Sequence, residues 1–442
     1  MSKLRTFSTQ PEKERAFLVG VEIHNRPSFL SINDSLQELS LLAATAGLEI
    51  IGQANQKLDR PNPSTFIGSG KVEELKILIE DSQANLVIFD DELSPRHLRE
   101  LEEKFGEGVR VLDRTALILD IFALHANTAE GKLQVELAQY EYLYPRLTRA
   151  WTHLARQAGG GAGRTGGVGG VGLRGPGEKQ LEVDRRRVRT RIAFLKEELE
   201  NVRAHRHQYR QMRKKSHIPI IALVGYTNAG KSTLINQLTH SDVLVADKLF
   251  ATLDPITRRL ELAGGNTILI TDTVGFIQKL PTQLIAAFRA TLEEISEADL
   301  LLHIVDVSHP AAMAQWKSVQ STLVDIDCGQ IPAITLLNKI DRTIDTQQMY
   351  LSIPEWTNAI PISAMTGQGI DGLLHRIIQE LFETLVPILV KLPYAQGQLI
   401  SLFHQSGQIE KIEHGIGDVR IKGNIPGRFV SKFMPFIINK KN

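Results

Sequence analysis

The stretch GYTNAGKS, residues 225–232, places two glycines, a lysine and a serine at the spacing G-x-x-x-x-G-K-S, between an apolar run typical of a buried strand and a run with helical spacing. Gly225 and Gly230 allow backbone torsions and close approach that a Cβ would block. Loop amides at the start of a helix attract phosphate oxygens. Lys231 can reach β- and γ-phosphate oxygens, and the Ser232 hydroxyl can ligate Mg²⁺. The pattern predicts a loop that binds a nucleoside triphosphate.

Two later segments carry residues that such a site needs around the γ-phosphate. In FATLDP (250–255), the Thr252 hydroxyl can complete the Mg²⁺ shell when a γ-phosphate is present. In DTVGF (272–276), which follows an expected strand, Asp272 can hold the Mg²⁺ shell through a water, and the Gly275 N–H can contact the γ-phosphate.

Two more segments are suited to reading the base. In NKID (338–341), the Asp341 carboxylate can accept from N1–H and the 2-amino group of guanine, a donor pair that adenine lacks. Asn338 can brace the neighbouring loops, and the Lys339 stem can cover the base. In SAMTGQG (363–369), the Ala364 N–H can donate to guanine O6. NKID alone is also compatible with a surface turn, and the dipeptide SA is a weak signal, but five segments in this order favour Mg²⁺-dependent hydrolysis of GTP.

The expected site is therefore a defined set of positions. We expect catalysis to rest on Lys231, Thr252 and Gly275, with Ser232 and Thr252 as direct metal ligands. The residues expected to contact GTP are Gly225, Tyr226, Thr227, Asn228, Ala229, Gly230, Lys231, Ser232, Thr233, Phe250, Ala251, Thr252, Leu253, Asp254, Asp272, Thr273, Val274, Gly275, Asn338, Lys339, Ile340, Asp341, Ser363, Ala364 and Met365.

One position departs from the Ras-like pattern. Phe276 stands where Ras-like GTPases have a glutamine that positions the attacking water. A phenyl ring cannot accept a hydrogen bond from that water, so we expect slow intrinsic hydrolysis, completed by groups from a partner or from elsewhere in the segment. The alternative is that Gln278 swings into the site. Asn228 resembles an asparagine of GTPases that bind K⁺, which makes K⁺ a candidate cofactor beside Mg²⁺.

The charge of the chain is unevenly distributed. The net charge is +1, but residues 140–217 contain 18 Lys and Arg against 7 Asp and Glu, and this asymmetry suggests a polyanionic partner. A solvated helical surface is the alternative. Within this region the glycine-rich stretch 159–180 lacks G-K-S/T and follows a helical pattern, so we interpret it as a tip that enters an RNA-walled space, or else as a linker without contacts. The candidate RNA contacts are Arg164, Arg174, Lys179, Arg185, Arg186 and Arg189.

The order of elements predicts an α/β protein with four parts. Residues 1–125 alternate strand and helix signals, which indicates a small α/β domain with a largely parallel sheet. Two helical patterns within 126–217, around Thr128–Arg156 (with Pro145 as a kink) and Glu178–Lys214, predict an antiparallel hairpin with the glycine-rich tip at 159–177. Residues 218–386 predict a phosphate-loop domain with a mainly parallel sheet. Pro387 and Pro393 are interpreted as a linker, and 387–442 as a small α+β domain.

Composition points to an intracellular protein. Cys328 is the one cysteine, so no internal disulfide is expected. No apolar run reaches the length of a membrane-spanning helix, and the first residues lack a signal-peptide core. We expect a cytoplasmic monomer without stable membrane insertion and without a DNA partner. The stretch STFIGSGKVEEL (64–75) could bind an anion, but it lacks full phosphate-loop spacing and is better interpreted as a helix cap.

The motifs GYTNAGKST, FATLDP, DTVGFI and NKID, with GLRGPGEKQLE (172–182) ahead of them, resemble the HflX family of ribosome-associated GTPases over nearly the whole chain. The resemblance implies binding to the large ribosomal subunit and its RNA, and splitting or rescue of stalled ribosomes under stress such as heat. The alternatives are a GTP-timed subunit-assembly factor, and, against the sequence evidence, a membrane-linked signalling GTPase. Lys179 replaces a usual threonine, and GAGRTGGV (161–168) is an apparent insertion.

Overall fold

The computed structural model describes residues 14–24, 29–147, 176–215, 218–239, 249–250, 255–262, 265–279, 294–343, 353–382 and 385–438. The chain divides into two compact units. The first comprises Met1–Glu261 with Asn266–Gln368, and the second Leu262–Gly265 with Gly369–Asn442. Each unit is described by itself below.

The first unit begins with a parallel four-stranded sheet of order β2-β1-β3-β4. Its strands are β1 (Arg15–Ile23), β2 (Glu49–Leu58), β3 (Leu86–Phe89) and β4 (Arg110–Asp113), and the helices between and after them are α1 (Ile32–Thr45), α2 (Ser69–Ser82), α3 (Pro95–Phe105) and α4 (Arg114–His125). The predicted small α/β fold is confirmed. Because parallel strands end at one edge of the sheet, Asp90 after β3 and Asp113 at the end of β4 lie at the same edge.

Helix α4 was not predicted from the sequence. Its run LILDIFAL is apolar on nearly every face, and such a run lacks the one-sided periodicity that marks a surface helix. Asp113 begins the helix, since its side chain accepts from the Ala116 N–H. A helix with so little polar surface is expected to be covered on most sides, and α4 is buried from Arg114 to Leu119 and at Ile121 and Phe122, whereas Leu124 near its end is 66% exposed.

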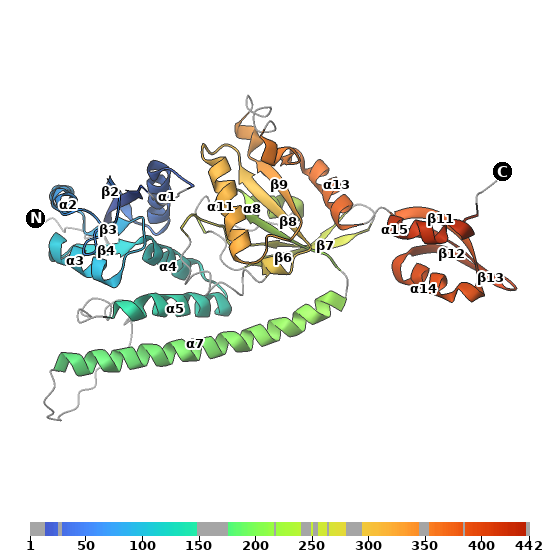
Figure 1. Cartoon of the computed structure of the whole chain (residues 1–442), viewed down its shortest axis with the longest axis horizontal. Helices are drawn as coiled ribbons and strands as arrows, with labels where there is room; N and C mark the ends of the chain where they lie inside the picture. Colours follow the sequence, from blue (N-terminus) through green and yellow to red (C-terminus); the bar gives the residue numbers. More distant parts are fainter. Residues whose placement is uncertain are drawn as a thin grey trace, which may run out of the picture. The chain divides into compact units, whose positions relative to one another are not determined.

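The predicted antiparallel hairpin is confirmed in its described part (Figure 1). Helix α5 (Ala129–Leu143) ends in a 3₁₀ turn (Tyr144–Arg146), and α7 (Pro176–Lys215) runs back beside it. Leu137 packs against Leu195 and Leu199, and closer to the turn Arg185 donates to the Leu147 carbonyl. The α-helix thus ends before Pro145 and is not merely kinked there, because proline cannot supply the N–H that continues a helix. The stretch 148–175, with most of the glycine-rich tip, lies outside the described residues.

A six-stranded sheet of order β10-β9-β8-β5-β7-β6 completes the first unit. Its strands are β5 (Ile220–Gly225), β6 (Ile256–Glu261), β7 (Thr267–Asp272), β8 (Leu300–Asp306), β9 (Ala333–Asn338) and β10 (Ile360–Pro361), with helices α8 (Lys231–Thr239) and α11 (Ala312–Asp325). All pairs are parallel except β6 with β7. Strand β5 lies between β7 and β8, so the loop after it leaves the middle of the sheet, where open α/β sheets bind ligands.

The second unit contains α13 (Ile370–Leu381) and an antiparallel sheet of order β11-β13-β12, formed by β11 (Leu385–Pro393), β12 (Gln408–His414) and β13 (Asp418–Pro426), with α14 (Gly397–Ser406) and α15 (Gly427–Phe433). The α+β prediction is confirmed. The interpretation of Pro387 and Pro393 as a linker is wrong, because both belong to β11. An edge strand tolerates proline, since one of its sides needs no ladder hydrogen bonds.

Candidate active site

The phosphate loop follows β5 and ends at α8, as predicted. A Cβ at Gly225 would collide with the Ile304 carbonyl oxygen, and one at Gly230, whose φ is +97°, with the Asn338 amide. The Lys231 ammonium is buried and donates to the Gly225 carbonyl at 3.2 Å and the Tyr226 carbonyl at 2.9 Å. Burial lowers the pKa of Lys231 to about 8, against the opposing effect of Asp272. The loop therefore holds its cation in place by main-chain carbonyls.

The residues expected around Mg²⁺ are adjacent. The Ser232 hydroxyl donates to an Asp272 carboxylate oxygen at 2.6 Å, where the start of α8 meets the end of β7. Thr273 fixes the following turn by donating to the Leu223 carbonyl at 2.6 Å. A hydroxyl and a carboxylate are the hard oxygen ligands that Mg²⁺ prefers, so the pair fits the ion. Mg²⁺ bound there would neutralise charge on the phosphates. Thr252, with Ala251, Leu253 and Asp254, lies outside the described residues.

The base-reading loops are joined by hydrogen bonds. Asn338 donates to the Ala229 carbonyl at 2.8 Å and accepts from the Ala364 N–H at 2.9 Å, so it braces the phosphate loop against the segment 363–369. Ser363 donates to the Asp341 carboxylate at 2.6 Å. Lys339 adopts a left-handed conformation and pairs with Asp306 at 2.7 Å. In this structure the Ala364 amide is engaged by Asn338, and its donation to guanine O6 stays a prediction.

Four other residues that the sequence predicted to contact GTP differ in their surroundings. Ile340 is buried in a cluster with Trp356 and Leu337, so its side chain serves packing, whereas Met365 is 79% exposed. Thr233 lies in the first turn of α8. Val274 packs against the large core cluster of this unit.

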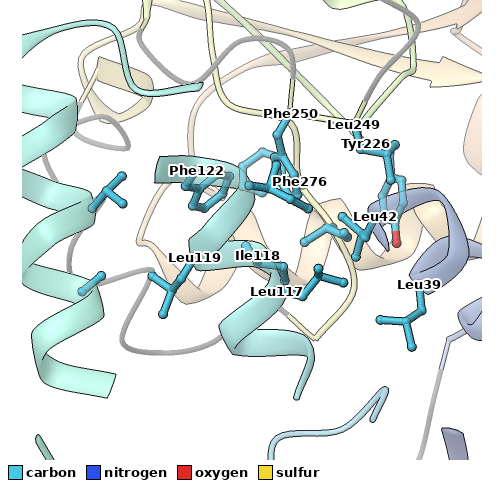
Figure 2. Packing of buried hydrophobic residues seen from close by; sticks show 14 of the residues in the cluster. Leu39, Leu42, Leu117, Ile118, Leu119, Phe122, Tyr226, Leu249, Phe250 and Phe276 are labelled. Carbon is cyan, nitrogen blue, oxygen red and sulfur yellow. The ribbon is translucent and has the colours of Figure 1, made fainter. Parts of the chain in front are cut away.

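Phe276 and Tyr226 point into a hydrophobic cluster shared with the N-terminal sheet domain. Phe276 is 3% exposed and Tyr226 4%, and both belong to one cluster with Leu42 of α1 and Phe122 of α4 (Figure 2). Phe250 packs edge-on against Phe122, with ring centroids 4.6 Å apart. The phenyl ring at the glutamine position is therefore used to hold two parts of the chain together.

A buried ion network lies beside this cluster, and it was not predicted from the sequence. Arg114 pairs with Asp90 at 2.6 Å and with Glu38 at 2.5 Å, while Lys279 pairs with Asp90 at 2.6 Å and with Asp91 at 2.9 Å. Burial opposes ionisation of Asp90, but Arg114 and Lys279 outweigh it and keep the pKa of this carboxyl below its ordinary value. Burial and the nearby Glu38 carboxylate raise the pKa of Tyr226.

Two features of the sequence could have indicated the network. The pair Asp90-Asp91 directly follows a buried strand, and Arg114 opens a mostly apolar helix. A charge in such a position needs a partner. What the sequence could not provide was the partner itself, since Lys279 lies 189 residues beyond Asp90.

Part of the candidate RNA interface is described. Arg186 is exposed on α7, whereas Arg189 donates to the Tyr144 hydroxyl and lies over its ring, and Arg185 donates to the Leu147 carbonyl. The latter two therefore also hold the hairpin together. Arg164, Arg174 and the Lys179 side chain lie outside the described residues.

A central strand feeding a phosphate loop, a serine–aspartate metal pair and the Asn338–Asp341 loop define a P-loop GTPase. Comparison with known families agrees. Residues 33–123 match the family described as GTP-binding GTPase N-terminal, 125–213 the GTP-binding GTPase Middle Region, and 220–339 the 50S ribosome-binding GTPase family. The protein is therefore an enzyme that binds and hydrolyses GTP, a reaction that in general uses Mg²⁺.

Similar proteins narrow this class. The chain is 43% identical to GTPase HflX of Caldanaerobacter subterraneus subsp. tengcongensis over 429 residues, which cover 97% of this chain and 95% of the relative. It is 44% identical to GTPase HflX of Escherichia coli K12 over 379 residues, 86% of each. The crystal structure of SsGBP with GDP matches with 26% identity and a TM-score of 0.47 over 83% of this chain and 98% of that one. The chain belongs to the HflX family of GTPases, as its motifs indicated.

Proposed function

We propose that this protein is a ribosome-directed GTPase whose hydrolysis is slow until the large ribosomal subunit completes the site. The observation that carries the proposal is the burial of Phe276 against the N-terminal sheet domain. With that side chain in the hydrophobic cluster, the position presents no group that can orient the attacking water. Gln278 is also buried, at 6% exposure, and its N–H donates to the Tyr226 hydroxyl at 2.8 Å. A partner must therefore reposition this segment or add a group of its own.

The large subunit is the partner that two observations support. Residues 220–339 match a family described as 50S ribosome-binding. The hairpin exposes basic side chains along α7, among them Arg186 and Arg187, which suit RNA phosphates. Arg164 and Arg174 at the glycine-rich tip, and Lys179 near the start of α7, would extend this interface, while the alternative remains that the tip is a linker without contacts.

We further propose the division into parts at 1–125, 126–217, 218–386 and 387–442, with the last boundary moved ahead of Leu385 because β11 (Leu385–Pro393) runs across it, and we propose action as a cytoplasmic monomer with no DNA partner. No helix in the described part of the chain is long and apolar enough to cross a membrane.

Binding of K⁺ at Asn228 is a separate proposal. Asn228 takes a left-handed conformation in the phosphate loop. Faster GTP hydrolysis in K⁺ than in Na⁺ buffer at equal ionic strength would support it, and equal rates would exclude it.

The first experiment measures GTP hydrolysis with and without purified large subunits over a salt series. We expect stimulation by the subunits that weakens as salt rises, because each phosphate contact adds about 0.7–0.9 to the log–log slope for simple nucleic acids. Replacing Arg186 and Arg187 by glutamine should reduce stimulation and flatten the slope while leaving basal hydrolysis unchanged. Arg259→Gln, on the 64%-exposed side chain of β6, is the matched control. A rate of GTP hydrolysis that is the same with and without large subunits would refute the mechanism in which a partner completes the site.

The second experiment separates ribosome splitting from the alternative of a GTP-timed assembly factor. Intact ribosomes are incubated with the protein and a non-hydrolysable GTP analogue, and subunits are resolved by sedimentation. Splitting or rescue requires dissociation into subunits that depends on the triphosphate. Binding to free large subunits alone, with intact ribosomes left whole, would favour the assembly factor.

A further inference from the structure

The segment Asp272–Lys279, which follows β7, is attached to the phosphate loop along several successive residues. Phe276 forms a parallel bridge with Tyr226, in which the Phe276 N–H donates to the Gly225 carbonyl at 3.0 Å and the Phe276 carbonyl accepts from the Thr227 N–H at 2.8 Å. The Gln278 N–H donates to the Tyr226 hydroxyl at 2.8 Å. The segment therefore occupies one fixed position on the loop.

That position lies where a γ-phosphate must approach. A Cβ built on Gly275 would stand 2.8 Å from Thr227 Cγ2 and 3.0 Å from the Lys231 ammonium, so the Gly275 backbone lies directly against both residues. The Phe276 carbonyl carries partial negative charge and already takes the Thr227 N–H. A third phosphate would meet repulsion and a filled space there, whereas a diphosphate, which ends one group earlier, would not.

The ion pairs of Lys279 hold the segment in this position. Lys279 has a left-handed backbone conformation, with φ +55°, which costs free energy for a residue with a side chain. Its ammonium is 2.6 Å from Asp90 and 2.9 Å from Asp91, both at the end of β3 in the N-terminal sheet. When the Lys279 ammonium moves away, Asp90 still forms its ion pair with Arg114. It also still accepts a hydrogen bond from the Ser35 hydroxyl at 2.7 Å. The pair can therefore open without leaving Asp90 as an uncompensated buried charge.

From this geometry we infer that Lys279, through Asp90 and Asp91, is a positioning residue that sets the preference of the site for GDP over GTP. GTP must displace Gly275 and Phe276, and with them the Lys279 pairs, whereas GDP binds with the pairs intact. A contact present in only one of two states shifts their balance by its own free energy. Removing the ammonium should therefore tighten the binding of GTP and leave that of GDP unchanged.

The test uses the full chain with Mg²⁺ and measures the dissociation constants of GDP and of a non-hydrolysable GTP analogue. We expect Lys279→Met to bind the analogue about tenfold more tightly, equivalent to about 1.4 kcal/mol, with GDP affinity within about twofold of the unmodified protein. Lys279→Arg should restore the original ratio. Lys71→Met is the matched control, because Lys71 makes a comparable 2.7 Å pair with Glu74 within α2.

An unchanged ratio of the two affinities in Lys279→Met, or an equal loss of both, would overturn the inference, since a merely structural role moves both nucleotides together. If that variant melts early, Asp91→Asn provides the same test with a smaller shift in the same direction, because the pair with Asp90 remains. The inference rests on the GTP site alone. No ribosomes enter the measurement, so its failure would leave the proposed function intact, and the failure of ribosome stimulation would leave this inference intact.

Discussion

Replacing Arg114 by methionine removes the cation at the centre of the buried ion network. The Arg114 side chain is 2% exposed and serves two carboxylates, Glu38 at 2.5 Å and Asp90 at 2.6 Å. Breaking a buried pair from one side costs about 3–5 kcal/mol, because a charge is left in a medium that solvates it poorly. Asp90 retains Lys279, whereas Glu38 loses the guanidinium beside it, so we expect a loss near the middle of that range.

Because the first compact unit spans Met1–Glu261 with Asn266–Gln368, the loss corresponds to a fall in Tm of about 5 °C, at about 1–2 °C per kcal/mol for a unit of that length. Scanning calorimetry measures the fall, and hydrogen exchange of the α4 and β3 amides assigns it to the N-terminal sheet. Arg99→Met is the control, since Arg99 makes a surface pair at 3.5 Å with its neighbour Glu100 and such pairs contribute little. If Arg114→Met melts within about 2 °C of this control, the network does not stabilise the fold and the reasoning fails.

The pH dependence of this variant has a definite sign. In the unmodified protein the pKa of Asp90 is depressed, so its contribution is present above the ordinary carboxyl pKa and is lost as pH falls. Without Arg114, burial acts on Asp90 with less opposition, so the pKa of this carboxyl rises. Acidification from pH 7 to 5 should then narrow the difference in Tm between the two proteins, and a difference that widens would contradict this account.

Three further outcomes are expected at the nucleotide site. Since burial lowers the pKa of Lys231 to about 8 and bound phosphates favour its charged form, GDP affinity should fall above pH 8, and a titration of fluorescent GDP that stays flat from about pH 7.5 to about pH 9.5 would contradict this. Ser232→Ala removes the hydroxyl beside Asp272, so Mg²⁺ should no longer tighten GDP binding; a comparison with EDTA present checks it, and a preserved difference rejects the assigned ligand. Asp341→Asn turns an acceptor into a donor against guanine and should weaken GTP about tenfold to a hundredfold while favouring xanthosine triphosphate. If a competition assay shows the same preference for GTP over xanthosine triphosphate in the variant, Asp341 does not recognise the base.

The nucleotide site was largely predictable because its geometry is local. A phosphate loop needs its glycines, lysine and serine within eight residues, and each later segment follows a strand whose apolar run is visible in the sequence. The Asn338 brace and the Ser232–Asp272 pair follow once parallel strands bring their ends together. Helix α4 was not predicted because an evenly apolar run has no periodic pattern. Strand β11 was not predicted because prolines are ordinarily evidence against a strand.

The packing role of Phe276 could not be predicted from the sequence. From the sequence, a phenylalanine in this position is only the absence of a catalytic glutamine. In the fold it is a buried contact, packed in the cluster that Phe122 and Leu42 build from the N-terminal sheet domain. A glutamine there would bury an amide among apolar side chains, at a cost of about 1–3 kcal/mol unless it found partners. The phenylalanine that replaces a water-positioning glutamine thus connects the segment Asp272–Lys279 to the N-terminal sheet domain. If GTP displaces this segment, the movement must disturb the shared core as well as the ion pairs of Lys279.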